Sequence, residues 1–435
     1  MKTYTFPYGT TNQHLSLDEE HVLLYLDSPQ AKAVRDEEEA IRKSLYKPVS
    51  GRPLRECVKT GGTVVIVVSD ITRPVHTDRM LRILVGELNL MGVQDEQITV
   101  LIALGTHRQQ TREETEAVCG ADMVRRLYIV QHDCHDESQL LSVGVTSRGN
   151  QVRINRLAVE ADTLIVTGGI SFHDMAGFGG GRKAILPGIA GYDTIMANHA
   201  LALSDDEADG MNHNCDAGKL QGNPIHEDMM EGAAFVPPHF LLNLVFTASG
   251  SLYDVVSGTW DTAWQKGCEK LLALDGVPIP TQADVVIGSA GGYPKDINMY
   301  QATKAHMNAV FAVKPGGIMI LAMACEDMYE PASFADWFFR DDLSQVLTEV
   351  KQHFTIPAFS AYKTRCIIRQ LKAVIIVTEP QYFHVIRKSG QIPALSMDEA
   401  WGIARGLLTE DGKEASYTVT VMPYAASTLP LYTGK

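Results

Sequence analysis

The sequence predicts an α/β protein built from two doubly wound, Rossmann-like domains, and three observations lead to this prediction. Short runs rich in Val, Ile and Leu recur, and they are apolar throughout rather than alternating, which is typical of strands buried on both faces of a parallel sheet. Amphipathic helical patterns lie between these runs. The 435 residues also exceed what one compact core usually holds. The strand-like runs are 63–69, 98–104, 163–167, 241–246, 285–287, 318–322, 374–377 and 418–421.

Helix and boundary signals support the same organisation. The segment 78–90 is amphipathic and closes at Gly92, and Thr111 with Glu114 forms a capping box at the start of another helix. The polar segment 275–282 contains two prolines that interrupt regular structure. We therefore expect one domain over residues 1–275 and a second over 276–435, with the final strand at 417–422 compatible with either sheet.

Charge and composition exclude several classes of protein. The formal net charge is −14, and no run of Lys and Arg could follow a phosphate backbone, so nucleic acid is not expected as a partner. No apolar stretch reaches the roughly 18 residues that a membrane helix needs, and the first residues lack the apolar core of a secretory signal. The seven cysteines form no C-x-x-C pair. We expect a soluble cytoplasmic protein with reduced thiols and no membrane partner.

Polar side chains follow the first three strand-like runs, where a parallel sheet places its ligand crevice. Asp70, Thr72 and Arg73 follow the first run, His107 follows the second, and His173 follows the third. A single loop histidine or arginine is most often only solvated. Their coincidence at one edge of the sheet predicts a functional site there.

A glycine-rich loop with a basic pair comes next, and it contains Gly179, Gly180, Gly181, Arg182 and Lys183. Such a loop is suited to a phosphate, because glycine lets backbone amides approach an anion. Its spacing fits neither a P-loop nor a dinucleotide fingerprint, so a tight turn or flexible active-site loop stays open as an alternative.

Two further candidates lie later in the chain. His199 follows in a short helical segment and is available to a metal or to the core; with His107 and His173 it could form a three-histidine zinc site, although no local spacing supports one. Tyr300 and Lys304 are four residues apart on a helical pattern, where a phenol and an ammonium could hold a carboxylate together. The alternative is a surface lysine beside a half-buried tyrosine.

At these residues the sequence resembles the nickel-dependent lactate racemase family, whose members use a nickel-pincer nucleotide. The similarity extends over nearly the whole chain. The segments that carry it are SDITRP at 69–74, GTHR at 105–108, SFHDMAGFGGGRKAILPGIAGYDTIMANH at 171–199, GNPIHEDM at 222–229, and GGYP with NMYQATK at 291–304.

The resemblance implies a role for each candidate residue. Lys183 matches the lysine joined covalently to the cofactor, His199 matches the nickel ligand, and His107 with His173 matches the acid–base pair. Arg73 matches the anchor of the substrate carboxylate. The second domain supplies Tyr300, Gln301 and Lys304 to a site expected in the cleft between the domains, and the cofactor surroundings include Asp70, Thr72, Gly179, Gly180, Gly181 and Arg182.

The reaction implied is inversion of C2 in a small anionic 2-hydroxy acid by reversible hydride transfer to the covalently bound nucleotide, through a 2-keto acid. Separate enzymes are expected to make the cofactor. Asp174, Met175 and Ser360 depart from the bulkier residues of the lactate enzymes, which favours a larger or more polar substrate such as an aldonate. A zinc hydrolase and a non-catalytic carrier of the nucleotide are the competing hypotheses, and the oligomeric state is not set by the sequence.

Overall fold

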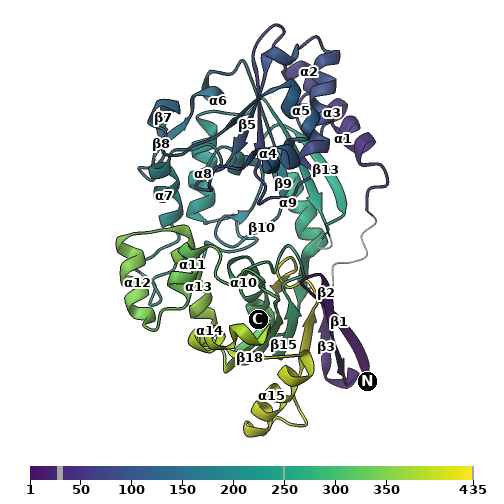
Figure 1. The fold of residues 1–435 in the computed structure, drawn as a ribbon, viewed down its shortest axis with the longest axis vertical. Helices are drawn as coiled ribbons and strands as arrows, with labels where there is room; N and C mark the ends of the chain where they lie inside the picture. Colours follow the sequence, from purple (N-terminus) through teal and green to yellow (C-terminus); the bar gives the residue numbers. More distant parts are fainter. Residues whose placement is uncertain (27–32, 248–249, 434–435) are drawn as a thin grey trace. The chain divides into compact units, whose positions relative to one another are not determined.

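The computed structural model describes residues 1–26, 33–247 and 250–433, which form two compact units. Unit 1 comprises Met1–Gln30, Leu203–Asn212 and Ala273–Lys435, and unit 2 comprises Ala31–Ala202 and His213–Leu272. Figure 1 shows both units as layers of helices and strands. The chain thus begins in unit 1, builds unit 2 and returns.

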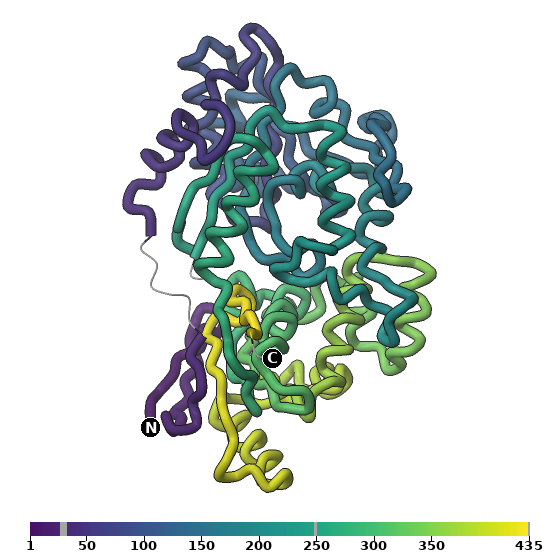
Figure 2. The backbone as a smooth tube through the Cα atoms, turned by 180° about the vertical axis from the view of Figure 1, so that it is seen from behind, coloured from purple at the N-terminus to yellow at the C-terminus, as the bar shows by residue number. Residues whose placement is uncertain are grey.

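This division differs in two places from the expected domains 1–275 and 276–435, because Met1–Gln30 and Leu203–Asn212 both belong to unit 1. The N-terminal strand β3 (Val22–Tyr25) pairs in parallel with β19 (Val419–Met422), so the start of the chain belongs with its end, as Figure 2 shows. The final strand-like run, expected at 417–422 in either sheet, is β19 and lies inside the sheet of unit 1. Non-local strand pairing, which leaves no mark in composition, places the N-terminal segment in unit 1.

The sheet of unit 2 carries the first set of predicted strands. Its order is β13-β12-β9-β4-β5-β6, parallel except for the antiparallel edge strand β13. The continuous apolar runs make these strands because both faces are buried, as in β4, where Val64 to Val68 are at most 4% exposed. The strands are β4 (Val64–Ser69), β5 (Ile98–Ala103), β6 (Tyr128–Gln131), β9 (Thr163–Ile170), β12 (Phe240–Phe246) and β13 (Leu252–Gly258).

Helices cover both faces of this sheet. On one face, α1, α3 and α4 join a core that includes Ile41, Met80 and Val118. On the other, α9 packs close enough that a Cβ at Gly267 would meet Ile170 and Val256. The helices of unit 2 are α1 (Glu37–Tyr46), α2 (Leu54–Cys57), α3 (Thr77–Leu90), α4 (Arg112–Cys119), α5 (Ala121–Arg126), α6 (Arg156–Glu160), α7 (Tyr192–Ala200), α8 (Pro224–Ala234) and α9 (Thr262–Asp275), which ends in unit 1.

Short hairpins complete unit 2. One joins β7 (Leu140–Val145) to β8 (Gln151–Asn155), and another joins β10 (Phe172–His173) to β11 (Gly177–Phe178). The predicted helix at 78–90 matches α3, and the capping box of Thr111 opens α4. That helix ends at Gly120, whose φ of +87° favours glycine, and α5 follows as a separate helix.

Unit 1 has an all-parallel sheet of order β18-β17-β16-β15-β19-β3. Helices α10, α11 and α13 contribute to the core on one face, while α15 and the β1–β2 hairpin contribute to the core on the other. The remaining elements are β1 (Lys2–Tyr8), β2 (Thr11–Leu17), β15 (Ala283–Ser289), β16 (Val313–Ala322), β17 (Ala373–Val377), β18 (Ile392–Ala394), α10 (Met299–Ala309), α11 (Ala332–Phe338), α12 (Leu343–Gln352), α13 (Ile356–Gln370), α14 (Phe383–Lys388) and α15 (Met397–Glu410).

The predicted fold class, doubly wound α/β in two parts, is confirmed. The proline-containing boundary segment is itself ordered as β14 (Gly276–Ile279), which pairs with β20 (Leu429–Tyr432). All seven cysteines are free thiols. Within the described residues, no helix is both long and apolar enough to cross a bilayer.

Candidate active site

The polar side chains predicted at one edge of the sheet lie there in unit 2. Neighbouring strands β9, β4 and β5 end at this edge. Asp70 directly follows β4, His107 follows β5 after a short turn, and His173 lies in β10 just beyond β9. The parallel arrangement therefore gathers residues that are far apart in sequence, as the topological argument requires.

His107 is oriented by a buried carboxylate. Its Nδ1 hydrogen-bonds Oδ2 of Asp70, whose residue is only 3% exposed. The other oxygen of Asp70 accepts hydrogen bonds from the Thr72 amide at 3.1 Å and hydroxyl at 2.7 Å. Burial alone would raise the pKa of Asp70, but the hydrogen bonds from His107 and Thr72 hold it below its ordinary value. With Nδ1–H donated to this carboxylate, Nε2 of His107 keeps the lone pair and is suited to act as a base.

His173 is held in a different way. Its Nδ1 lies 3.2 Å from the amide nitrogens of both Met175 and Ala176, and 3.4 Å from a carboxylate oxygen of Asp174. Because two amides donate to Nδ1, the neutral ring carries its hydrogen on Nε2. Nε2 lies 3.1 Å from Nζ of Lys183.

Lys183 is a lysine with the properties of a nucleophile. It lies on a short 3-10 turn, Gly181–Ala184. Burial, together with the charges of Arg182 and Arg73, lowers its pKa to about 7. A large share of the amine is therefore neutral at neutral pH, which also agrees with its acceptance of a hydrogen bond from Nε2–H of His173.

His199 has the environment of a metal ligand. It lies on α7, is 2% exposed, and its Nδ1 lies 3.0 Å from the carbonyl oxygen of Ile195. Donation of Nδ1–H to that carbonyl leaves the lone pair on Nε2, an arrangement common in metal-binding histidines. Burial and the charge of Lys183 lower its pKa to about 3, so the ring is neutral, as metal binding requires.

Arg182, expected beside a cofactor phosphate, is placed elsewhere by the structure. The residue is 0% exposed, and its guanidinium donates to the carbonyl oxygens of Phe178 and Ala176, both at 2.8 Å. Its other contact is the ring of Trp264, 4.0 Å away. Burial lowers its pKa to about 9. Arg182 thus fixes the loop around Lys183 from inside rather than offering charge to a ligand.

The glycines of this loop are also occupied by the protein itself. Gly179 donates its amide to Ser171 O at 2.7 Å, and Gly181 donates its amide to the Asn243 side chain at 2.8 Å. Gly181 has a φ of +56°, and a Cβ there would lie 2.4 Å from the ring of Trp264. These two amides therefore do not form the expected phosphate cradle; Gly179, Gly180 and Gly181 allow close packing instead.

The remaining predicted site residues are Arg73 in unit 2 and three residues of α10 in unit 1. Arg73 is exposed and donates to Thr72 O at 3.3 Å and to the Thr72 hydroxyl at 3.2 Å. In unit 1, Gln301 and Lys304 lie on the first turns of α10, with Lys304 Nζ 2.7 Å from the Gln301 amide oxygen. The ring of Tyr300 lies 5.2 Å from that of Phe334. Gln301 and Lys304 are thus brought together within unit 1, and Tyr300 packs on an aromatic neighbour.

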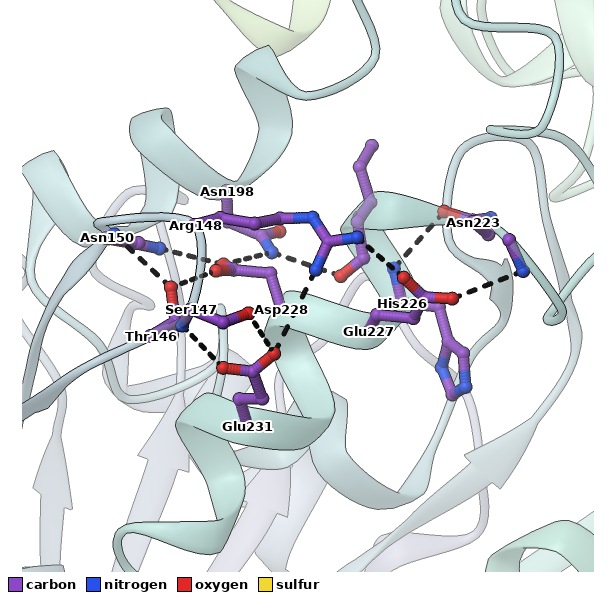
Figure 3. A network of polar contacts seen from close by, with 12 residues as sticks. Thr146, Ser147, Arg148, Asn150, Asn198, Asn223, His226, Glu227, Asp228 and Glu231 are labelled. Carbon is purple, nitrogen blue, oxygen red and sulfur yellow. Dashed lines mark hydrogen bonds and ion pairs between the residues drawn. The ribbon is translucent and has the colours of Figure 1, made fainter.

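Sequence reasoning missed a buried polar network behind the site, which Figure 3 shows. Its centre is Asp228 of α8, which accepts hydrogen bonds from Thr146, Asn150 and Asn198. Asp228 lies in the segment GNPIHEDM, so the similarity to the family marked its position but gave no role for it. The zinc hypothesis gains no support, because no group of three His, Cys, Asp or Glu side chains suited to a metal occurs in the part of the chain that the structure describes.

Fold and site together define a doubly wound α/β protein that gathers histidines, a buried carboxylate and a lysine of lowered pKa at one edge of a parallel sheet. Family models identify it further: residues 8–210 match the lactate racemase N-terminal domain and residues 279–429 match the lactate racemase C-terminal domain. The chain belongs to the lactate racemase family. It is therefore an isomerase, a racemase acting on a hydroxy acid.

Individual relatives agree. The chain is 32% identical to a lactate racemase from Thermoanaerobacterium thermosaccharolyticum over 99% of both chains, and 34% identical to one from Lactiplantibacillus plantarum over 75% of this chain and 76% of that protein. The solved lactate racemase apoprotein from T. thermosaccharolyticum superposes with a TM-score of 0.88 at 30% identity, covering 99% of this chain and 100% of that chain.

Proposed function

We propose that this enzyme inverts C2 of a 2-hydroxy acid with a nickel-pincer nucleotide attached to Lys183. The observation that carries the proposal is the pairing of a buried amine of lowered pKa with a buried neutral imidazole in the same site. The residues fit the group: the amine of Lys183 can be acylated at neutral pH, and His199 would hold nickel through Nε2. When bound, the group supplies an acceptor and donor of hydride.

The histidines of the chain handle the protons of the reaction. His107, with the lone pair on Nε2, would remove the hydroxyl proton of one enantiomer and become an imidazolium, while His173, in its imidazolium form, would return a proton from Nε2 on the other side and become neutral. The two exchange roles in the reverse direction. Asp70 keeps His107 in the required tautomer, so it supports the reaction through His107 rather than by contact with the cofactor.

The cationic residues would hold the substrate by its carboxylate. Arg73 presents an exposed guanidinium at the edge of the unit 2 sheet and can bind a carboxylate in bidentate fashion. In unit 1, the ammonium of Lys304 and the amide of Gln301 lie together and offer a second polar contact. Held in this way, a planar 2-keto acid can reorient without leaving the site.

The substrate is proposed to be larger or more polar than lactate, such as an aldonate. Asp174 and Met175 directly follow His173, and Ser360 lies on α13. The resemblance to the lactate enzymes implies bulkier residues at these positions in that family. A hydroxyl and a carboxylate there favour a substrate with further hydroxyl groups.

The test is intact-mass analysis of protein made together with the enzymes that synthesise the nucleotide, followed by chiral separation of a 2-hydroxy acid panel. We expect a mass adduct and racemisation or epimerisation in the wild type, both absent in Lys183→Ala and both retained in Lys266→Ala, which changes an exposed lysine. An adduct that persists in Lys183→Ala would refute covalent attachment at this residue. An adduct without turnover of any acid would favour a carrier, and lactate as the best substrate would refute the larger pocket.

A further inference from the structure

Helix α8 (Pro224–Ala234) contacts both segments that bear His173 and His199, although it supplies neither histidine. Asn223 caps its N-terminus and Asp228 lies in its second turn, and both are 0% exposed. Buried polar side chains are costly unless fully bonded, so their partners show what the helix holds in place.

Asp228 holds the helix that carries His199. Its carboxylate accepts from the Asn198 amide at 2.8 Å and from the Asn150 amide at 2.9 Å, and it also accepts from the Thr146 hydroxyl at 2.5 Å (Figure 3). The same Asn198 nitrogen lies 3.1 Å from Ile225 O of α8. Asn198 directly precedes His199 on α7, so these bonds fix the last turn of α7 against α8.

Asn223 holds the loop that carries His173. Its side-chain nitrogen donates to Met175 O at 2.9 Å and to Lys219 O at 3.0 Å, while its oxygen accepts from the amide of His226. The amide of Met175 in turn donates to Nδ1 of His173. Asn223 therefore holds the carbonyl of Met175, the same residue whose amide helps to set the tautomer of His173.

The outer side of α8 has a polar layer that touches neither histidine segment. Glu231 accepts from the amide and hydroxyl of Ser147, both at 2.6 Å, and Glu227 accepts from Arg148 at 2.6 Å (Figure 3). These bonds tie α8 to the turn between β7 and β8. The same helix thus supplies a natural control, because its outer contacts contribute to stability without reaching the site.

We propose that α8 is the positioning element of the active site: Asp228, through Asn198, sets the place of His199, and Asn223, through Met175, sets the place and tautomer of His173. Asp228 and Asn223 are thereby positioning residues for the reaction. The proposal rests on the roles given above to the two histidines. The carboxylate of Asp228 accepts from three neutral donors at once and fixes all three. The side-chain amide of an asparagine in its place must point its own NH₂ group at one of these donors.

The experiment compares Asp228→Asn and Asn223→Ala with the matched control Glu231→Gln. The first measurement needs no cofactor: ring ¹H–¹⁵N correlation spectra of the apoprotein with ¹⁵N-labelled histidine, assigned through His199→Asn and His173→Asn. We expect Asp228→Asn to shift the His199 signals, Asn223→Ala to shift those of His173, and Glu231→Gln to shift neither. Unfolding midpoints measured alongside show how much each change destabilises the fold.

The second measurement is the kinetics of the loaded enzyme. We expect kcat to fall about 10- to 100-fold in Asp228→Asn and Asn223→Ala, with KM changed less than kcat, because the substrate contacts remain. If Asp228→Asn fails to fold, Asn198→Ala removes the same contact while Asp228 keeps Thr146 and Asn150, and it must give the same His199 shift. Equal losses of stability in all three variants, with unchanged histidine spectra, would overturn the proposal. Because the spectra are taken on apoprotein, failure of the cofactor assignment would leave their result standing.

Discussion

The two histidines at the sheet edge differ in what holds the inner nitrogen of each ring. His107 donates Nδ1–H to the carboxylate of Asp70, whereas His173 accepts at Nδ1 from the amides of Met175 and Ala176. The first arrangement leaves a lone pair on Nε2, and the second leaves a hydrogen there. The difference teaches that neighbouring groups alone can give two chemically identical side chains opposite tautomers.

The largest effect should come from removing either histidine. His107→Asn and His173→Asn are each expected to lower kcat by about 10² to 10⁴, the usual range for a general acid or base. Each variant should slow turnover of both substrate stereoisomers, because either direction uses both rings. Rates measured from each pure stereoisomer check this, with the exposed His384→Asn as a control. A variant with the wild-type rate would remove that histidine from the pair.

The carboxylate behind His107 should matter next. Asp70→Asn keeps the shape of the side chain but can turn an NH₂ toward Nδ1, which disfavours the tautomer with a free lone pair on Nε2. We expect kcat to fall about 10- to 100-fold while the unfolding midpoint changes little. Steady-state kinetics and thermal unfolding of the same preparation measure both. A fall in stability with unchanged kcat would show that Asp70 only supports the loop.

His173 differs from His107 also in its contact with Lys183. Burial and the charges of Arg182 and Arg73 lower the pKa of this lysine, which predicts a pH effect on the stability of the apoprotein. The pKa of Lys183 is lowered to about 7 in the folded protein, from 10.5 in the unfolded chain. Below pH 10.5 the amine is charged in the unfolded chain, so folding must either bury this charge or release the proton, and both cost free energy of folding. The penalty is complete below pH 7 and disappears as pH rises toward 10.5.

Lys183→Met should therefore stabilise the apoprotein by on the order of 1–2 kcal/mol at pH 7, a value discounted for partial exposure. The gain over the wild type should shrink as pH rises from 7 to 10.5. Urea unfolding at several pH values measures it, with Lys266→Met as the exposed control. A gain that does not change with pH would mean that the amine is not responsible.

The smallest effect is expected at Asp174. Its carboxylate lies 3.4 Å from Nδ1 of His173, but that nitrogen already accepts from two amides. Asp174→Asn should therefore change kcat by less than about twofold on a substrate too short to reach it. A fall as large as that of Asp70→Asn would show that both histidines depend on carboxylates and would remove the contrast between them.

The sequence predicts best the strands that are buried on both faces along their length. The runs that became β4, β5 and β9 are apolar on both faces, and their order along the chain suffices to place Asp70, His107 and His173 at one edge. The β1–β2 hairpin was missed, although Tyr4 and Phe6 are buried while Thr3 and Thr5 are exposed, an alternation that signals an antiparallel strand.

The loop around Lys183 shows why part of the site escapes such reasoning. Glycines followed by a basic pair look like an anion site when read locally. Their actual partners, Trp264 and Asn243, lie far along the chain and become neighbours only in the folded unit. Asp228 was overlooked for the same reason, since three of its donors come from two distant segments.

The pairing of β3 with β19 has a consequence for how the protein is made. β3 emerges from the ribosome early, yet the strand with which it pairs in the described part of the sheet, β19, is made near the end of translation. Unit 2 can be fully synthesised and folded in the interval, whereas β3 must wait for β19 until translation nears its end. Nascent chains halted late in translation would therefore carry a folded unit 2 and an incomplete unit 1 with an exposed strand edge.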